Sequence, residues 1–334
     1  MRDVAVIAFA QTPFVRCERA RDEADLVRTV VSGALAKAGL PMQEIGFTCS
    51  GSSDLLCGRP FSFVAAIDGI AAWPPIRESH VEMDGAWALY EAWARLQHGD
   101  IDTALVYSFG KSSPGPVREV MALQLDPYSL GPLGLDSVSM AALQAQAMLH
   151  EGLITEREMA EVAVRSRRAA ASNPHAQLRS SPDVDTLLAA PHLVAPLRKH
   201  DCPPISDGAA AIVLAAGDRA RALTANPAWI AAIEHRIDAH QPGHRSLTTS
   251  ASAALAGGKC GASDSAVEVA ELHAPFTHQE LLLRKALGIP ATAVVNPSGG
   301  ALAANAIMVA GLVRLGEAAQ RVLDGEARVT IGHA

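Results

Sequence analysis

The sequence contains few aromatic residues, no closely paired cysteines and no long run of basic or apolar residues. Aromatic residues make up 4% of its 334 residues, and the formal net charge is -7. Nucleic-acid binding generally needs clustered lysine and arginine, so this class of partner is not expected. No apolar stretch reaches the roughly 20 residues that span a bilayer. The composition, 49% hydrophobic and 19% charged, is instead typical of a globular enzyme with a well-buried core.

The five cysteines are scattered along the chain and form no C-x-x-C pair. They are Cys17, Cys49, Cys57, Cys202 and Cys260. This spacing favours reduced thiols in a cytoplasmic protein over a disulfide framework or a zinc site, and no metal is expected. The first residues, MRDVAVIAFAQTPF, contain no basic leader or small-residue cleavage site, so they predict a first strand rather than a signal peptide.

Apolar runs and periodic segments alternate along the chain and predict an α/β fold. Strands are expected at residues 4–8, 45–49, 103–109, 209–215, 229–235, 265–272, 293–295 and 328–331. Helices are expected at residues 22–38, 85–97, 138–151, 156–171, 251–256, 279–287 and 302–322. Because several strands are apolar throughout, the pattern favours a mixed sheet covered by helices on both faces.

The alternation divides the chain into two halves with the same β-α-β theme and little residue-level repeat. The first half is expected at residues 1–218 and the second at residues 219–334. Within the first half, residues 111–204 contain proline-rich and irregular sequence around two helices. Insertions of this kind usually form lids or pocket walls in α/β proteins, so we expect this region to border a ligand.

A glycine-rich turn precedes the long helix expected at residues 302–322. It has the sequence Asn296-Pro297-Ser298-Gly299-Gly300. Glycines allow the backbone to approach a ligand closely, and the helix that follows presents free N–H groups and a positive dipole end. A carbonyl oxygen that develops negative charge would be stabilised there. The alternative is a tight turn that only packs a strand against a helix.

His273 follows the strand expected at residues 265–272 and is a candidate catalytic residue. An imidazole at a strand end can donate a hydrogen bond to an oxyanion or exchange a proton near neutral pH. His278 lies five residues further on, near the start of the next helix, and is a candidate for ligand binding. The alternative for both is the usual one for a lone histidine, a position at the surface or behind the site.

Four segments, in this order and spacing, resemble the thiolase superfamily, and specifically its sterol-carrier-type and bacterial lipid-transfer-protein branch. They are residues 80–89 (HVEMDGAWAL) with 102–106 (DTALV), 206–211 (SDGAAA), 267–277 (VEVAELHAPFT) and 296–302 (NPSGGAL). The resemblance covers the whole chain. It implies a five-layered α-β-α-β-α fold with two similar halves, a homodimer, and a coenzyme A thioester as substrate without a covalently bound cofactor. It also assigns to substrate or coenzyme A binding the residues Asn296, Ser298, Gly299, Gly300, His278 and Asn305.

The cysteine nucleophile of the family is missing from its expected position. Thiolases carry a Cys-any-Ser-Gly motif at a helix start, and matching Gly85 to that glycine puts Glu82 at the cysteine and Asp84 at the serine. A carboxylate replaces a thiolate poorly in acyl transfer, because an anhydride is more labile than a thioester. Glu82 and Asp84 are therefore candidate catalytic residues, with Glu82 as a base. The alternative for each is a cap of the helix that starts at Gly85.

Two further parts of the chain differ from the family pattern. Degradative thiolases follow the glycine-rich turn with a Gly-His-Pro whose histidine activates the cysteine, whereas this chain has residues 304–307 (ANAI) there. The family's second catalytic cysteine lies beyond the last strand. This chain ends at Ala334, so its C-terminal half is expected either to be shortened relative to the family or to continue in a tail outside this sequence.

The resemblance leaves three functions open. Some members of this branch lack the cysteine and resemble aldolases, which favours a carbon–carbon lyase for retro-aldol cleavage of a β-hydroxyacyl-CoA in steroid or lipid side-chain degradation. Glu82 and His273 are then the base and the oxyanion donor. Such aldolases resemble complexes with an acyl-CoA-binding partner that carries a zinc ribbon and an OB-fold. The alternatives are an acetyl-CoA acetyltransferase or other thiolase-type acyltransferase, and a non-catalytic acyl-CoA-binding subunit of a heteromeric complex.

Overall fold

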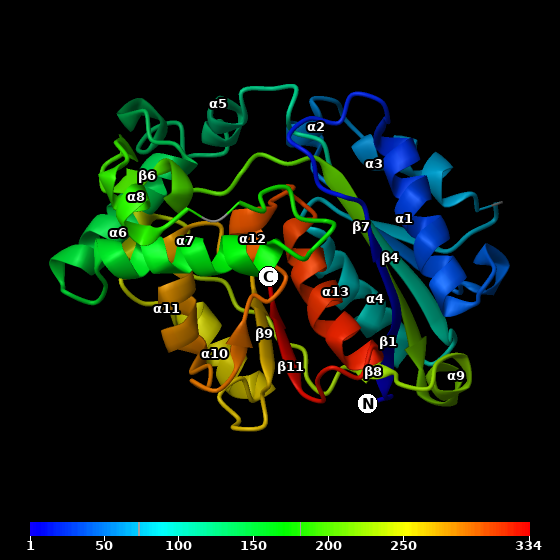
Figure 1. The fold of residues 1–334 in the computed structure, drawn as a ribbon. Helices are drawn as coiled ribbons and strands as arrows, with labels where there is room; N and C mark the ends of the chain where they lie inside the picture. Colours follow the sequence, from blue (N-terminus) through cyan, green and yellow to red (C-terminus); the bar gives the residue numbers. More distant parts are fainter. Residues whose placement is uncertain (73, 181) are drawn as a thin grey trace.

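The structure, a computed structural model, describes residues 1–72, 74–180 and 182–334. Two β-sheets lie in its interior, and helices cover the outer face of each sheet and fill the space between them (Figure 1). The order is therefore helix, sheet, helix, sheet, helix. The predicted five-layered α/β fold is confirmed.

The first sheet is mixed and has the strand order β3-β2-β4-β7-β1-β8. Its strands are β1 (Val4–Gln11), β2 (Thr48–Gly51), β3 (Glu78–Val81), β4 (Thr103–Gly110), β7 (Gly208–Ala216) and β8 (Ala228–Trp229). β2 runs parallel to β3 and β4, whereas β7 is antiparallel to β4 and β1. Every residue of β4 and β7 is buried, because helices cover both faces, and this explains their continuous apolar sequences.

The second sheet is smaller and parallel, with the strand order β10-β9-β11. Its strands are β9 (Val269–Leu272), β10 (Val294–Val295) and β11 (Thr330–His333). Because parallel strands end at the same edge of a sheet, the residues that follow β9 and β11 lie side by side. His273 follows β9, and its backbone N–H donates to the carbonyl oxygen of His333 at 3.0 Å.

The helices fall into three layers. The outer face of the first sheet carries α1 (Glu23–Ala38) and α3 (Ser62–Ile67). Between the sheets lie α4 (Gly85–Gln97) and α13 (Ala310–Leu323). The outer face of the second sheet carries α10 (Ala251–Cys260) and α11 (Thr277–Leu287), as Figure 1 shows. The middle layer therefore brings α4 from the first half of the chain against α13 from the second.

The region expected as a lid, residues 111–204, forms a helical cap beside the second sheet; residue 181 of this region lies outside the described residues. Its elements are α5 (Val117–Ala122), α6 (Ser137–His150), α7 (Glu156–Ala170), α8 (Val184–Ala189), β5 (His192–Val194) and β6 (Leu197–Arg198). α6 shares an apolar cluster with Phe276 and Leu282 at α11, and α7 contacts both α11 and α12 (Gly300–Ala303). The region is thus packed against the part of the chain that carries the glycine-rich turn.

The long helix expected at residues 302–322 is wrong, because two helices separated by a break replace it. α12 ends at Ala303 and α13 begins at Ala310. Within the break, Met308 has a φ of 74°, and its carbonyl oxygen accepts hydrogen bonds from the backbone of Gly85 and from the Ser108 hydroxyl. No proline or glycine in the sequence signals this break. It arises because distant segments bind a backbone group that a continuous helix would use itself.

Other boundaries differ by a few residues. The strand expected at residues 229–235 is limited to β8, and the strand expected at residues 265–272 begins only at Val269. The short helix α2 (Asp54–Cys57) follows β2. α9 (Gly217–Leu223) links β7 to the segment before β8. Within the described ranges, no helix combines the length and the apolar character needed to cross a membrane.

Candidate functional site

The candidate site lies where the ends of β9 and β11 meet the start of α4 and the break between α12 and α13. His273 Nε2 lies 3.2 Å from Asn305 Oδ1. Asn305 is held in turn, since its backbone N–H donates to Ser206 Oγ at 3.0 Å. The structure therefore brings together two residues that the sequence analysis assigned separately, and Ser206 of the SDGAAA segment supports them.

His273 is a neutral imidazole near pH 7. Burial lowers its pKa, while the Asp84 carboxylate and the hydrogen bond with Asn305 oppose that shift. With Asn305 Oδ1 facing Nε2, the proton lies on Nε2 and Nδ1 carries a free lone pair. Among the described residues, the one side-chain hydrogen bond of His273 is the Nε2 contact with Asn305, and Nδ1 takes no part in it. His273 thus presents one unoccupied nitrogen and remains partly accessible to solvent.

Asp84 caps two helices at once. Its Oδ1 accepts from the backbone N–H of Ala86 at 2.9 Å and of Leu312 at 2.9 Å, and its Oδ2 accepts from that of Gly311 at 3.0 Å. The carboxylate therefore satisfies free N–H groups at the starts of α4 and α13. A Cβ on Gly311 would lie 2.5 Å from Asp84 Oδ1, so the approach needs glycine at this position. The cap interpretation of Asp84 is confirmed and extends to a second helix that the sequence does not indicate.

Replacing Asp84 by alanine is expected to lower the free energy of unfolding by about 2–4 kcal/mol. The change leaves three backbone N–H groups without an acceptor, whereas loss of an ordinary N-cap costs about 0.5–2 kcal/mol. Asp183→Ala is the matched control, because Asp183 caps only α8. Urea unfolding of both variants measures the difference. Equal losses in the two variants would show that the bridge to α13 contributes nothing.

Glu82 does not cap α4. Its Oε1 accepts from the backbone N–H of Asp54 at 2.6 Å, at the start of α2, and its Oε2 lies 3.6 Å from His80 Nε2. The side chain is 50% exposed, so solvent reaches the carboxylate. The prediction that Glu82 is a base remains untested, and the alternative helix cap is seen at α2 instead of α4.

The glycine-rich turn has the unusual backbone that its sequence predicts. Asn296, Gly299 and Gly300 have φ values of 51°, 97° and 62°. A Cβ on Gly299 would lie 2.6 Å from the Cβ of Ala170 at the end of α7, so only glycine fits against that helix. Asn296 and Ser298 are nearly completely buried. The turn is therefore rigid and closely packed, and its expected contact with a ligand stays a prediction.

Buried acids hold this turn from below. Glu271 accepts from both the backbone N–H and the hydroxyl of Ser298, at 2.9 and 2.7 Å. Arg314 Nη1 lies 2.6 Å from Glu271 Oε2, and both side chains are almost inaccessible to solvent. Asn296 Nδ2 donates to Glu280 Oε2 at 2.8 Å. The candidates chosen from sequence do not include Glu271, Arg314 or Glu280. Glu271 and Arg314 are charged residues inside the apolar patterns of β9 and α13, and this is a signal that could have identified them.

His278 lies in the core between α6 and α11. Its Nε2 lies 3.2 Å from Gln144 Oε1, while its Nδ1 is buried without a partner among the described residues. Burial lowers its pKa to about 3, so the ring stays neutral over the physiological range. This location gives no contact with the His273–Asn305 pair, and ligand binding by His278 remains a prediction.

Acid is expected to destabilise the protein through His278 and His333. Burial lowers the pKa of His333 to about 4, and that of His278 to about 3. Below pH 6.5 these two histidines bind protons in the unfolded chain but stay neutral in the folded chain. Their contribution to the free energy of unfolding is therefore complete above pH 6.5 and is lost as the pH falls toward their folded-state pKa values. Each histidine contributes a loss of about 2 kcal/mol between pH 6.5 and 5. Urea unfolding at both pH values measures the loss.

His278→Gln is expected to reduce this acid loss, and His240→Gln to leave it unchanged, because His240 is exposed. The quantity compared is the change in unfolding free energy between the two pH values within each variant. A loss of stability in His278→Gln that is the same at both pH values does not affect it. An acid loss of the same size in both variants would contradict the assignment to His278.

The match of Glu82 to the thiolase nucleophile, made on sequence motifs alone, stays a prediction. Among the described residues, none of the five cysteines forms a hydrogen bond with His273 or Asn305. Cys49 is buried in β2, and Cys57 ends α2. Residues 304–307 form the break beside His273, and Asn305 is the polar side chain that this segment presents. No group of three or more His, Cys, Asp or Glu within the described ranges is arranged to hold a metal ion.

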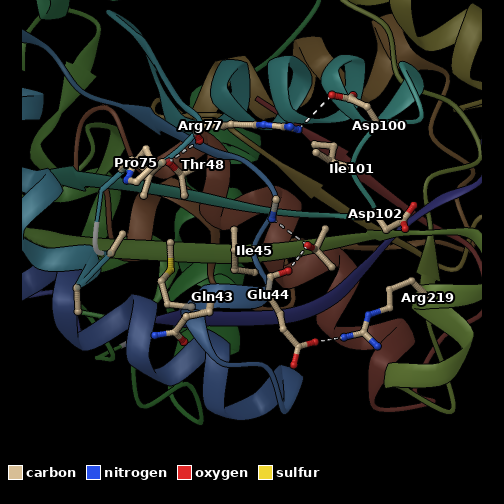
Figure 2. A pocket seen from close by; sticks show the side chains of 16 residues that line it. Gln43, Glu44, Ile45, Thr48, Pro75, Arg77, Asp100, Ile101, Asp102 and Arg219 are labelled. Atoms are coloured by element: carbon tan, nitrogen blue, oxygen red, sulfur yellow. Dashed lines mark hydrogen bonds and ion pairs between the residues drawn. The ribbon is translucent and has the colours of Figure 1, made fainter.

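A hollow of about 660 Å³ lies at the opposite end of the first sheet, near the amino ends of β2 and β4. Figure 2 shows that its polar rim consists of paired charges, with Arg77 beside Asp100 and Glu44 beside Arg219. Ile45 and Ile101 contribute to its apolar lining. Because its charged groups already neutralise one another and none of the candidate site residues lines it, this hollow is not the candidate site.

No family model matches the chain. It is 28% identical over 240 residues to an acetyl-CoA acetyltransferase of Methanothermobacter thermautotrophicus, a match that covers 70% of this chain and 62% of that enzyme, less than two thirds of its length. It is 26% identical to human sterol carrier protein 2, with 100% of this chain and 70% of that protein covered.

Two solved structures have a closely similar fold. The Ltp2-ChsH2(DUF35) aldolase matches with a TM-score of 0.80 and 22% identity, over 96% of this chain and 90% of that chain. Human mitochondrial 3-ketoacyl-CoA thiolase in complex with CoA matches with a TM-score of 0.76 and 15% identity, over 99% and 95% of the two chains. The chain therefore has the thiolase fold, and its resemblance to the sterol-carrier-type, lipid-transfer branch of the thiolase superfamily is confirmed.

Proposed function

We propose that the protein cleaves a carbon–carbon bond of a β-hydroxyacyl-CoA by a retro-aldol reaction. The observation that carries this proposal is the combination of a His273–Asn305 pair with a solvent-accessible Glu82, the residue that the sequence motif matches to the thiolase cysteine. This set supplies a base and a hydrogen-bond donor but no thiolate. Retro-aldol cleavage needs the first two and does not need a covalent nucleophile.

The break between α12 and α13 supports a shared site for these groups. Asn305 contacts His273 at one end of the break, and Met308 accepts from the Gly85 backbone at its other end, at 2.9 Å. Three residues of chain span at most about 11 Å, so His273 and the start of α4 lie within the reach of one acyl thioester. Glu82 is three residues before Gly85.

The chemistry balances without a co-reactant. Glu82 takes the proton of the β-hydroxyl, the bond between the α and β carbons breaks, and its electrons move onto the thioester as an enolate. The Asn305 amide, oriented by His273, donates a hydrogen bond to the enolate oxygen. Bond cleavage releases a ketone or aldehyde, and protonation of the α carbon yields the shorter acyl-CoA. Nδ1 of the neutral His273 can take a proton from water and pass it to the α carbon, while Glu82 returns its proton to the solvent, so no net proton is consumed.

A non-catalytic acyl-CoA-binding subunit is the second candidate, and one observation favours it. The Asp84 carboxylate is fully engaged by three backbone N–H groups, and one Glu82 oxygen is bound at the start of α2. Carboxylates that only bind backbone N–H groups also fit a non-catalytic subunit that has lost its enzymatic activity. An acyltransferase, the activity named for the archaeal relative, is disfavoured by the missing cysteine.

The proposed assembly follows the aldolase neighbour, whose name includes a DUF35 component. We propose a homodimeric core that acts in the cytoplasm, takes a coenzyme A thioester as substrate and needs no bound cofactor. We also propose a partner subunit with a zinc ribbon and an OB-fold that binds part of the acyl-CoA. Steroid or lipid side-chain degradation is the process that such a substrate would belong to.

The test offers the purified chain a β-hydroxyacyl-CoA and a β-ketoacyl-CoA, with and without the partner subunit. Release of a ketone or aldehyde from the first substrate is expected. CoA-dependent cleavage of the second substrate would establish an acyltransferase instead. Binding of acyl-CoA without turnover in any combination would establish the subunit function. Mass spectrometry of the acyl-CoA products distinguishes the three results.

A further inference from the structure

The side chains of Ser50, His80 and Glu82 form a line from the interior of the first sheet to its edge. Ser50 and His80 are register partners on the parallel strands β2 and β3, and Ser50 Oγ lies 3.0 Å from His80 Nδ1. His80 Nε2 lies 3.6 Å from Glu82 Oε2. Exposure decreases inward, from 50% for the Glu82 side chain to 15% for that of His80 and 1% for Ser50.

The imidazole of His80 is fixed in this line. It stacks on Phe63 with ring centroids 4.5 Å apart and an interplanar angle of 14°. Its Nε2 is buried and forms no hydrogen bond within the described ranges. When the Ser50 hydroxyl donates to Nδ1, the proton of the neutral ring lies on Nε2 and faces the Glu82 carboxylate. A buried N–H without an acceptor is costly, so a small movement of Glu82 toward His80 is favourable.

This arrangement has the residue types of a hydrolytic triad, but its serine is not accessible to a substrate. Ser50 is only 1% exposed, so no substrate reaches its hydroxyl. The accessible end of the line is Glu82, at the position where a thiolase has its nucleophile. Any chemistry of the line is therefore carried out by the carboxylate, and Ser50 and His80 act behind it.

We propose that His80 is a positioning residue for Glu82. Anchored by Ser50 and by the Phe63 ring, its Nε2 lies 3.6 Å from one carboxylate oxygen and is the donor toward which that oxygen turns, while the Asp54 N–H binds the other oxygen at 2.6 Å. A glutamate otherwise samples several rotamers, and two donors restrict it to one direction. The consequence for catalysis rests on the proposed function, in which Glu82 is the base. The orientation of Glu82 by His80 is independent of that function.

The first readout is turnover. His80→Phe keeps a ring to stack on Phe63 but removes both nitrogens, and it is expected to lower kcat about 10- to 100-fold with KM changed less than about threefold, because a small displacement of a reacting group has an effect of this size. His80→Gln restores a donor and is expected to recover part of kcat. His98→Phe is the matched control, since His98 is exposed at the far end of α4.

The second readout needs no substrate. Hydrogen exchange of the Asp54 amide reports whether Glu82 holds the start of α2, and His80→Phe is expected to speed it about three- to tenfold, the effect of one weakened hydrogen bond. Unchanged exchange in β4 shows that the fold is intact. Ser50→Ala, a smaller change that removes only the anchor, is expected to act in the same direction and serves if His80→Phe does not fold.

Unchanged exchange at Asp54 in both variants would overturn the positioning of Glu82 by His80. So would a fall in kcat that His80→Gln does not relieve at all. If the wild-type protein turns over no β-hydroxyacyl-CoA, the proposed function fails while the exchange measurement still decides the inference. The two failures are therefore distinguishable.

Discussion

The Arg314→Met variant is expected to lose about 3–5 kcal/mol of unfolding free energy at pH 7, because it leaves the Glu271 carboxylate buried without its partner. Arg314 Nη1 lies 2.6 Å from Glu271 Oε2, and the two side chains are 4% and 0% exposed. Glu271 also accepts two hydrogen bonds from Ser298. The loss should therefore loosen the turn that follows β10 as well as the packing of α13.

The deficit of this variant should shrink as the pH falls. Burial raises the pKa of Glu271, and the nearby Arg314 opposes that shift. Without Arg314 the folded-state pKa rises further above the unfolded value, so the folded chain binds a proton that the unfolded chain does not. Such a group favours folding at low pH and loses that contribution as the pH rises through the folded-state pKa. Urea unfolding at pH 7 and pH 5 measures the change.

Arg321→Met is the matched control for this prediction. It makes the same substitution on the same helix, but the Arg321–Glu326 pair is partly exposed, with side chains 28% and 53% accessible. Pairs of this kind contribute about 0–1 kcal/mol. The double variant Glu271→Gln/Arg314→Met should be more stable than Arg314→Met alone. Equal losses in Arg314→Met and Arg321→Met would show that the buried pair has no special weight.

The His273→Ala variant is expected to lower kcat for the β-hydroxyacyl-CoA about 10²- to 10⁴-fold, the range in which positioned proton-transfer groups contribute. Asn305→Ala should lower it about 10²- to 10³-fold, as the loss of one oxyanion donor does. Because Asn305 and His273 form one hydrogen-bonded pair at 3.2 Å, the double variant should be little worse than His273→Ala alone.

His150→Ala controls for this experiment, since His150 is exposed at the end of α6 and far along the chain from the site. Isothermal titration with the acyl-CoA measures binding separately, and binding is expected to change much less than kcat. Wild-type turnover in His273→Ala would exclude this histidine from the reaction. Additive losses in the double variant would show that the two residues act independently.

Several features of the site follow from local sequence. The Gly85–Gln97 helix and an acid directly before it predict Asp84 as a cap, because the free N–H groups at a helix start need a nearby acceptor. The strand that ends at Leu272 predicts that His273 lies at a sheet edge. The glycine pair of the turn predicts positive φ, and Gly299 and Gly300 have it. Each of these rests on a hydrogen bond or a backbone angle within a few residues.

Other features of the site depend on residues far apart in the chain. Asn305 reaches His273 only because α12 and α13 are separate helices, and that break exists because Gly85 and Ser108 bind the Met308 carbonyl. No periodicity in residues 300–323 indicates it. Similarly, the sequence does not predict that a charged side chain is buried unless its partner is known, as with Glu271 and Arg314.

The sequence by itself determined that the chain alternates strands and helices and resembles the thiolase superfamily, and it predicted Glu82 at the position of the nucleophilic cysteine. Only the tertiary structure decided what the carboxylates do. Asp84 joins the starts of α4 and α13, and Glu82 turns toward Asp54 and His80. The reason is that apolar periodicity reports which face of an element is buried, whereas the partner of a polar side chain is set by which distant backbone group the packing of the layers places beside it.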